Sequence, residues 1–272
     1  MKFCMALSPT KANFAPLLFA GDLFLGMETA ARLGYNGVEL NLRDSGQLDQ
    51  DAILHKVNQL GLQVPSIGTG QSYFHDGLSL ADTRPEIQAA VRERLRGHIQ
   101  FACKLGAAVV LGSIRGKLET SSPEARQAGY DIAVDAAREL AIYAASLGIP
   151  LTIEPINRYE TNFLNTISET LSFIQAVGHP NIGLLADTFH MNLEERDMAS
   201  CLRQGGSLLW HVHFADSNRF APGMGHLNFK EYIDTLIDMG YNGYLSAEII
   251  PVPDSLSSAK AWIDAIRPMT KN

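Results

Sequence analysis

The chain has 272 residues and a formal net charge of −7 at pH 7; 46% of its residues are hydrophobic and 19% are charged. This length fits one α/β barrel domain, and the composition can bury a large core, so a disordered or collagen-like chain is excluded. The acidic balance argues against nucleic acid and anionic lipid as partners, and no apolar run approaches the roughly 20 residues that cross a membrane.

The three cysteines, Cys4, Cys103 and Cys201, are odd in number and lack CxxC spacing. The first apolar stretch, Phe3 to Leu7, is too short for the core of a signal peptide. We therefore expect reduced thiols and a cytoplasmic protein.

Short apolar, β-branched segments alternate with longer helical patterns along the whole chain, which is typical of repeated βα units. The predicted strands are Lys2 to Leu7, Gly37 to Leu42, Gln63 to Gly68, Ala107 to Ser113, Pro150 to Pro155, Ile182 to Asp187, Leu208 to Phe214 and Tyr244 to Ile250. The predicted helices include Asp22 to Leu33, Pro85 to Leu105, Pro123 to Leu147, Thr166 to Val177 and Phe229 to Met239.

Glycines follow most of these helical patterns, where a left-handed residue would end the helix before a buried parallel strand. They are Gly34, Gly61, Gly106, Gly148, Gly178 and Gly240. Eight strands with their crossovers predict a (β/α)8 TIM barrel that spans residues 1–272 as a single domain. The alternative is an open doubly wound sheet, but no G-x-G-x-x-G follows the first strand.

Acidic and histidine residues stand at the ends of the last four predicted strands. Glu154 interrupts the apolar fifth strand, and Asp187 does the same in the sixth. Because carboxylates are rarely buried unpaired, each needs a cation, a metal or a proton. The seventh strand adds His213 and the eighth Glu248. One such residue often only anchors a loop, but four at equivalent ends of consecutive strands predict a shared metal site.

Three carboxylates and one imidazole suit Mn²⁺, Mg²⁺ or Co²⁺, and Zn²⁺ could also occupy such a site. With a divalent ion the site would be formally singly negative, so the ion would still act as a Lewis acid. His211 shares a strand face with His213. It either orients that ligand or belongs to a polar layer of the barrel interior, and we favour the polar layer.

These residues resemble the ketose 3-epimerase family, the D-tagatose/D-psicose 3-epimerase group of the xylose-isomerase-like barrels. The matching motifs are EPINRYE at Glu154 to Glu160, DTFHMNLEE at Asp187 to Glu195, HVHFADSNR at His211 to Arg219, PGMGH at Pro222 to His226, and Glu248. The resemblance implies that Glu154, Asp187, His213 and Glu248 bind the metal, most readily Mn²⁺, and that Glu154 and Glu248 form the catalytic acid/base pair. It also implies that Glu160, His190 and Arg219 contact a bound ketose, and that the protein is a homodimer or homotetramer.

The chain departs from the group's usual pattern at two places. Ala215 and Asp216 replace a Gly-Glu pair, which leaves the hydrogen bonding around Arg219 open. The fourth strand runs into SIRGK, where Arg115 and Lys117 suggest an anionic substrate, because Arg can bind a carboxylate or phosphate through two hydrogen bonds. The alternative is a solvated loop whose charges face water.

The SIRGK segment and GTGQSYFHDGLSL, Gly68 to Leu80, also resemble the 5-keto-L-gluconate epimerases. Within the second segment, Phe74, His75 and Asp76 could shape or cover the pocket, but no role is assigned to them.

We therefore predict C3 epimerisation of a ketose or, slightly favoured, a keto sugar acid. The metal would stabilise an enediolate, while Glu154 and Glu248 on its two faces remove and return the proton. No organic cofactor and no nucleophile are expected, since the chain has no G-x-S-x-G or G-x-x-x-x-G-K-[ST] motif. We interpret Cys4 as a core residue.

Several alternatives stay open. An aldose-ketose isomerase would use the same metal site, and a phosphorylated ketose could engage Arg115 and Lys117. A nuclease of the AP-endonuclease type shares the barrel, but the net charge of −7 and only eight histidines argue against it. A non-catalytic sugar-binding barrel would not exchange substrate hydrogen with solvent.

Overall fold

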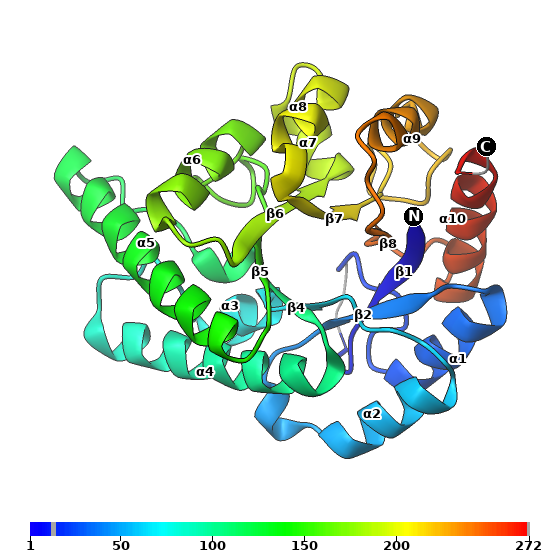
Figure 1. Ribbon diagram of the computed structural model, residues 1–272, viewed down its shortest axis with the longest axis horizontal. Coiled ribbons are helices and arrows are strands. Elements are labelled where there is room, and N and C mark those ends of the chain that lie inside the picture. The colour runs from blue at the N-terminus through cyan, green and yellow to red at the C-terminus, as the bar shows by residue number, and fades with distance from the viewer. Residues whose placement is uncertain (12–14, 271–272) are drawn as a thin grey trace.

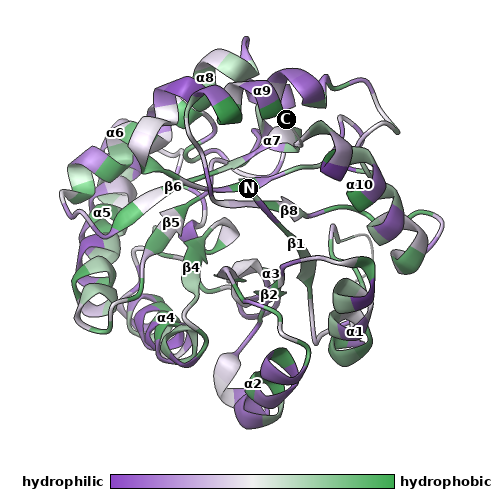
Figure 2. Cartoon of the chain, turned by 45° about the vertical axis from the view of Figure 1, so that its right-hand side comes forward, coloured by the Kyte–Doolittle hydropathy of each residue, from purple (hydrophilic) through white to green (hydrophobic). Residues whose placement is uncertain are grey.

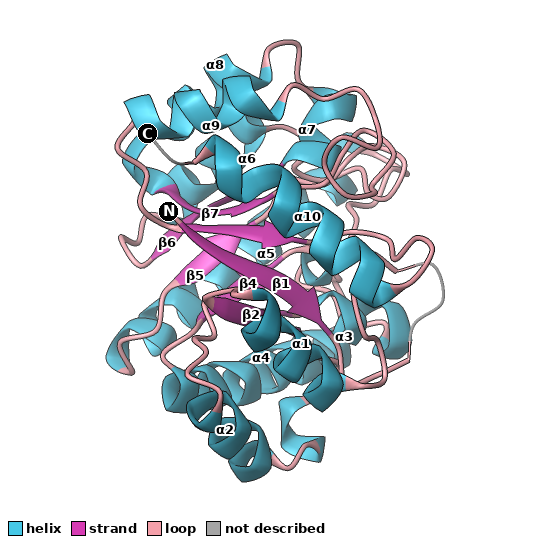
Figure 3. Cartoon of the chain, turned by 90° about the vertical axis from the view of Figure 1, so that its right-hand side faces the viewer, coloured by secondary structure: helices cyan, strands magenta, loops and turns pink. Residues whose placement is uncertain are grey.

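The structure, a computed structural model, describes residues 1–11 and 15–270. Its parallel strands pair in chain order, and β8 also pairs with β1, so the sheet closes into a barrel. Helices surround this barrel on the outside (Figures 1 and 3). The predicted (β/α)8 TIM barrel is confirmed.

The strands lie where the alternating pattern predicts them. They are β1 (Lys2–Leu7), β2 (Gly37–Asn41), β3 (Ser66–Gly68), β4 (Ala108–Leu111), β5 (Leu151–Ile153), β6 (Ile182–Asp187), β7 (Leu209–His213) and β8 (Tyr244–Ala247). Strand β3 begins later than predicted, because Pro65 has no N–H to donate to the sheet. Gln63, ahead of that proline, forms only an isolated bridge with Gly37.

The helices also follow the predicted positions, and short helices are added near the strand ends. They are α1 (Leu23–Leu33), α2 (Gln50–Gln59), α3 (Gly70–Asp76), α4 (Pro85–Leu105), α5 (Pro123–Ser146), α6 (Ile167–Val177), α7 (Thr188–Glu194), α8 (Met198–Gly205), α9 (Phe229–Asp238) and α10 (Ser255–Met269). Helices α1, α4, α5, α6 and α9 match the ranges given from the sequence, whereas α2, α3, α7, α8 and α10 were given no range there. Of these, α3 and α7 begin close to the ends of β3 and β6.

The helix ends confirm the role expected of the glycines. Gly106 has φ +67° directly after α4, a conformation that a residue with a Cβ adopts only with strain. The other five glycines predicted there also have positive φ. At the opposite ends of helices, side chains accept otherwise unpaired N–H groups: Ser122 accepts from Ala125 N before α5, and Thr166 and Glu169 form a capping box in α6.

The core lies between the strands and the inward faces of the helices. Figure 2 shows the mixed colouring of the outer helices α4 and α5 against the largely hydrophobic β4 and β5. Trp262 of α10 is fully buried and donates to Phe214 O at 2.7 Å, while its ring stacks on Tyr35. Cys4 is buried inside β1, as predicted for a core residue. Among the described residues, no helix combines the length and apolarity needed to span a bilayer.

Candidate active site

A cavity of about 650 Å³ opens where the strands end, within the size range of small-molecule sites. Asp187 and His213 are the last residues of β6 and β7, while Glu154 and Glu248 directly follow β5 and β8. Four consecutive strands therefore deliver these side chains to one end of the barrel, as the sequence predicts. Three of them, Glu154, His213 and Glu248, line the cavity, and Asp187 is fully buried beneath it.

The four side chains converge on a single point. His213 Nδ1 lies 3.4 Å from Glu154 Oε1 and 3.6 Å from both Asp187 Oδ2 and Glu248 Oε2. One ligand atom from each residue lies within 4.8 Å of all the others. Glu154 Oε1, Asp187 Oδ2 and His213 Nδ1 are buried without a hydrogen-bond partner. Unpaired acceptors facing one another are costly unless a cation satisfies them, so these residues fit a divalent metal.

Glu39 orients the histidine of this cluster, and sequence analysis missed it. Its Oε2 atom accepts hydrogen bonds from His213 Nε2, His211 Nε2 and Ser246 Oγ, each at 3.1 Å. When the imidazole of His213 is neutral with its proton on Nε2 toward Glu39, Nδ1 presents its lone pair to the cluster, as a metal ligand requires. Glu39 interrupts the apolar strand β2 just as Glu154 interrupts the predicted fifth strand, so the same rule could have found it.

His211 shares the Glu39 carboxylate with His213. It is buried below His213 on the same face of β7, with the two rings edge to face at a centroid distance of 5.3 Å. His211 thus belongs to a polar layer of the barrel interior, the interpretation that we favoured, and it contributes to orienting His213 by sharing the Glu39 carboxylate.

The pKa values follow from burial and the crowding of carboxylates. Burial raises the pKa of Glu154 to about 7, and Glu248 and Asp187 add to the effect. Burial also disfavours the charged forms of Glu248 and His213. For Glu248, His213 and Arg219 outweigh burial and lower the pKa. For His213, Glu39 and Glu248 outweigh burial and raise the pKa well above its ordinary value. Carboxylates that hold a proton on this imidazole also attract a metal cation.

The three residues expected to contact substrate oxygens all line the cavity. Arg219 donates from Nη1 to Glu160 Oε1 and from Nη2 to Glu248 Oε2, each at 3.2 Å, and its Nε is buried without a partner. Its guanidinium also lies 4.7 Å from the ring centroid of Phe189. Arg219 is therefore held in place with one donor free.

Asn157 and Arg219 hold the imidazole of His190 from its two sides. Asn157 Nδ2 and Asn157 N lie 2.8 and 3.4 Å from Nδ1, and Arg219 Nη2 lies 3.4 Å from Nε2. Burial lowers the pKa of His190 well below its ordinary value, and Arg219 and Arg115 add to the effect. His190 is therefore a neutral imidazole fixed at the cavity wall.

Asp216, at the departure from the family pattern, stabilises a loop. Its carboxylate accepts from the backbone N–H groups of Ser217, Gly223 and Leu227 at 2.7 to 3.1 Å. Its backbone oxygen accepts from Arg219 N, and Arg219 has φ +63°. The shorter side chain therefore stabilises the turn that carries Arg219 and does not pair with the guanidinium.

The structure contradicts the prediction that Arg115 binds substrate. Its guanidinium is 1% exposed and donates to the backbone oxygens of Gly112, Phe163 and Leu164 at 2.9 to 3.0 Å. The donors are occupied, and the side chain does not line the cavity. Lys117 is exposed and also lies outside the cavity lining, which agrees with the solvated-loop alternative.

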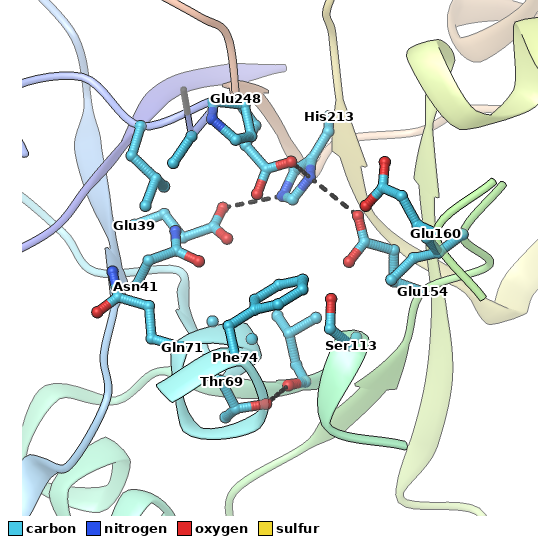
Figure 4. Close-up of a pocket in the computed structure, with 18 of the residues that line it drawn as sticks. Glu39, Asn41, Thr69, Gln71, Phe74, Ser113, Glu154, Glu160, His213 and Glu248 are labelled. Atoms are coloured by element: carbon cyan, nitrogen blue, oxygen red, sulfur yellow. Dashed lines mark hydrogen bonds and ion pairs between the residues drawn. The ribbon is translucent and has the colours of Figure 1, made fainter. Parts of the chain in front are cut away.

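The wall opposite Glu154 and Glu160 contains residues that sequence analysis did not identify. Figure 4 shows Glu39, Asn41 and Gln71 on that side of the cavity. Phe74 also lines the cavity, although its side chain is 65% exposed, and so does His75.

Asp76, the third residue of the unassigned trio, points elsewhere. It pairs with Arg43 and Arg94 at 2.5 and 2.7 Å.

Comparison with known proteins agrees with this geometry. The sequence profile of the family "Xylose isomerase-like TIM barrel" matches residues 27–269. The chain is 34% identical over 219 residues to the L-ribulose 3-epimerase of Methylomonas sp. (strain DH-1), a match that covers 80% of this chain and 75% of that protein. It is 31% identical over 210 residues to the ketose 3-epimerase of Arthrobacter globiformis, covering 77% and 71% of the two chains.

Among solved structures, D-allulose 3-epimerase from Methylomonas sp. in complex with D-allulose superposes with a TM-score of 0.85 at 26% identity. The match covers 99% of this chain and 97% of that chain.

Proposed function

Since the chain belongs to the xylose isomerase-like TIM barrel family and its homologues are ketose 3-epimerases, we propose that it is a metal-dependent epimerase acting at C3 of a ketose. The observation that carries the metal dependence is the convergence of Glu154 Oε1, Asp187 Oδ2 and His213 Nδ1, buried and unpaired, beside Glu248. Such a cluster on the floor of a sugar-sized cavity supports a site that handles negative charge on substrate oxygens.

Glu154 and Glu248 are the proposed acid/base pair. They follow strands β5 and β8 and reach the cavity from different sides (Figure 4). One carboxylate removes the proton at C3, and the other returns a proton to the opposite face of the planar intermediate; the reverse reaction exchanges these roles. A divalent ion held by the four ligands would supply Lewis-acid stabilisation of the charge that develops on the sugar oxygens.

Neighbouring side chains orient the substrate. The free Nε–H of Arg219 is a donor available to sugar oxygens, and the imidazole of His190 lies beside this guanidinium. Glu160 accepts from Arg219 and from Asn157 Nδ2, so it holds both the guanidinium and the residue that fixes His190. These contacts position the carbonyl end of the ketose between the two catalytic carboxylates.

A neutral ketose is now preferred over a keto sugar acid. The acid was favoured because of Arg115, whose donors are occupied by backbone oxygens. The relatives named above are epimerases of L-ribulose, of ketoses and of D-allulose, all of which are neutral sugars. The choice of Mn²⁺, assembly as a homodimer or homotetramer, and a cytoplasmic location stay predictions.

Hydrogen exchange in D₂O tests the function. The Mn²⁺-loaded protein is incubated with a panel of ketoses, and the position of incorporated deuterium is determined by NMR. Deuterium at C3 together with the C3-inverted product is the expected result. Label at C1 or C2 would instead identify an aldose-ketose isomerase with the same metal site, and absence of label would indicate a sugar-binding protein without catalysis.

A further inference from the structure

Two buried amides on the wall opposite Glu154 each carry an unpaired polar atom. Asn41 and Gln71 are 8% and 7% exposed, and both line the cavity. Among the described residues, Asn41 Nδ2 and Gln71 Oε1 are buried side-chain atoms without a hydrogen-bond partner. Neither atom belongs to the metal cluster. A buried donor and a buried acceptor left unpaired on a cavity wall are costly unless a ligand satisfies them.

The orientation of the Gln71 amide follows from its partner. Ser8 Oγ has one proton and donates it to Thr10 O at 3.1 Å, while it accepts from Thr10 N at 3.0 Å. Gln71 Nε2, 2.6 Å from the same oxygen, must therefore donate to it. The free atom is consequently Oε1, which can only accept a hydrogen bond.

Asn41 depends on a glycine beside it. It is the last residue of β2 and pairs in register with Gly68 of β3. A Cβ at Gly68 would lie 2.1 Å from Asn41 Oδ1, so a side chain there would displace the amide. The fold thus leaves room for Asn41 at the end of the strand, where its Nδ2 is an unpaired donor.

We propose that Asn41 and Gln71 form a subsite that recognises a hydroxyl group at the distal end of the substrate. This inference rests on the proposed function, which places the reacting carbons between Glu154 and Glu248 on the other side of the cavity. A hydroxyl accepts from Asn41 Nδ2–H and donates to Gln71 Oε1. An ionised carboxylate or phosphate has no proton to donate to Gln71, so its oxygens face the lone pairs of an acceptor.

The lysine and arginine that line the cavity do not change this conclusion. Among the described residues these are Lys11 and Arg219. Arg219 is paired with Glu160 and Glu248, and its free Nε–H belongs to the side of the cavity that holds the reacting carbons. Lys11 is exposed, and a solvated ammonium contributes little to binding an anion.

Paired substrates test the subsite. The Mn²⁺-loaded enzyme is assayed with a ketohexose, its 5-deoxy and 6-deoxy analogues, and the ketohexuronate of the same configuration. We expect kcat/KM for the ketohexose to exceed that for at least one deoxy analogue, and that for the acid, by about tenfold or more, because a site built to bind a hydroxyl rejects a substrate without it.

The variants Gln71→Leu and Asn41→Leu replace each amide by an apolar side chain of similar shape. Each should lower kcat/KM for the ketohexose by about ten- to a hundredfold, mainly through KM, and leave the sensitive deoxy analogue within about threefold. Gln71→Met is the second variant should Gln71→Leu not fold. Thr69→Val is the matched control, because its hydroxyl donates to Val110 O at 2.6 Å; it should affect both substrates equally.

Equal losses for the hydroxylated and deoxy ketoses in the Gln71 and Asn41 variants would overturn the subsite, as would a wild-type preference for the acid. If no ketose is epimerised, the proposed function fails separately. The subsite is then tested by calorimetric binding of the same sugars. A loss of affinity in Gln71→Leu confined to the hydroxylated sugar supports the subsite, and unchanged affinity contradicts it.

Discussion

The first half of the barrel, β1 to β4 with the segments that follow each strand, and the second half, β5 to β8 with theirs, contribute different chemistry to one cavity. Strands β5 to β8 supply the carboxylates and the imidazole that converge with unpaired atoms at 3.4 to 3.6 Å. Strand β2 supplies Glu39 and Asn41, and helix α3 supplies Gln71. Only Glu39 is charged, and it accepts hydrogen bonds from two histidines and a serine. This difference supports the proposal that the second half performs the reaction, while the first half orients a proposed metal ligand and contributes to substrate selection.

The largest effect should come from removing a carboxylate in the second half. Glu248→Gln removes a proposed metal ligand, a proposed acid/base group and the partner of Arg219. Epimerase turnover should fall by about 10³- to 10⁴-fold at saturating Mn²⁺, and deuterium exchange at C3 should fall with it. Turnover within tenfold of wild type would show that the reaction does not depend on this half of the barrel as proposed.

A substitution of Arg115 tests whether this residue of the first half stabilises the fold or binds substrate. Arg115→Met leaves the buried oxygens of Gly112, Phe163 and Leu164 without their donor. The free energy of unfolding should decrease by about 3 kcal/mol, measured by urea denaturation. The ratio of kcat/KM for acid and neutral substrates should stay constant at temperatures where the variant is folded. A fall in kcat/KM confined to acid substrates would show that Arg115 contacts the substrate after all.

Glu39 links the two halves. Glu39→Gln weakens the charged hydrogen bond that orients His213, so Mn²⁺ affinity measured by calorimetry should fall by about 10- to 100-fold. Cys4→Ala is the control, because Cys4 Sγ lies within 4.8 Å of a Glu39 carboxylate oxygen and of a His211 nitrogen, while its hydrogen bond goes to Leu245 O. The substitution leaves the Glu39–His213 hydrogen bond in place, so Mn²⁺ affinity should stay close to that of the wild type. Equal affinities in Glu39→Gln and wild type would mean that the second half binds metal without support from the first.

The smallest effect is expected at the rim of the cavity. Phe74 is 65% exposed and lines the cavity, so Phe74→Ala should raise KM by about fivefold through lost apolar contact with little change in kcat. Phe24→Ala is the control, since Phe24 is an exposed aromatic of α1 that does not line the cavity. Steady-state kinetics distinguish the two variants, and a large fall in kcat for Phe74→Ala would instead assign that ring to the reaction.

Much of the second half could be predicted from residues considered one at a time. Glu154 and Asp187 were recognised because a carboxylate within an apolar strand needs a partner, and strand ends in a barrel converge. Glu39 obeys the same rule in β2. It was missed because it stands inside the strand and not at its end, and its partners His211 and His213 are far away in the sequence. Asn41 and Gln71 carry no such signal, because neutral amides are common at strand and helix ends.

By itself, the sequence determined the closed barrel, the ends of most helices and the four converging candidate ligand residues, because hydrophobic periodicity, glycine conformations and buried charge are local properties. Only the tertiary structure decided the direction of each polar side chain. Arg115 meets the oxygens of Phe163 and Leu164 from a distant part of the chain, and Gln71 is oriented by Ser8. Whether a polar group is satisfied by the fold or left for a ligand depends on such distant partners.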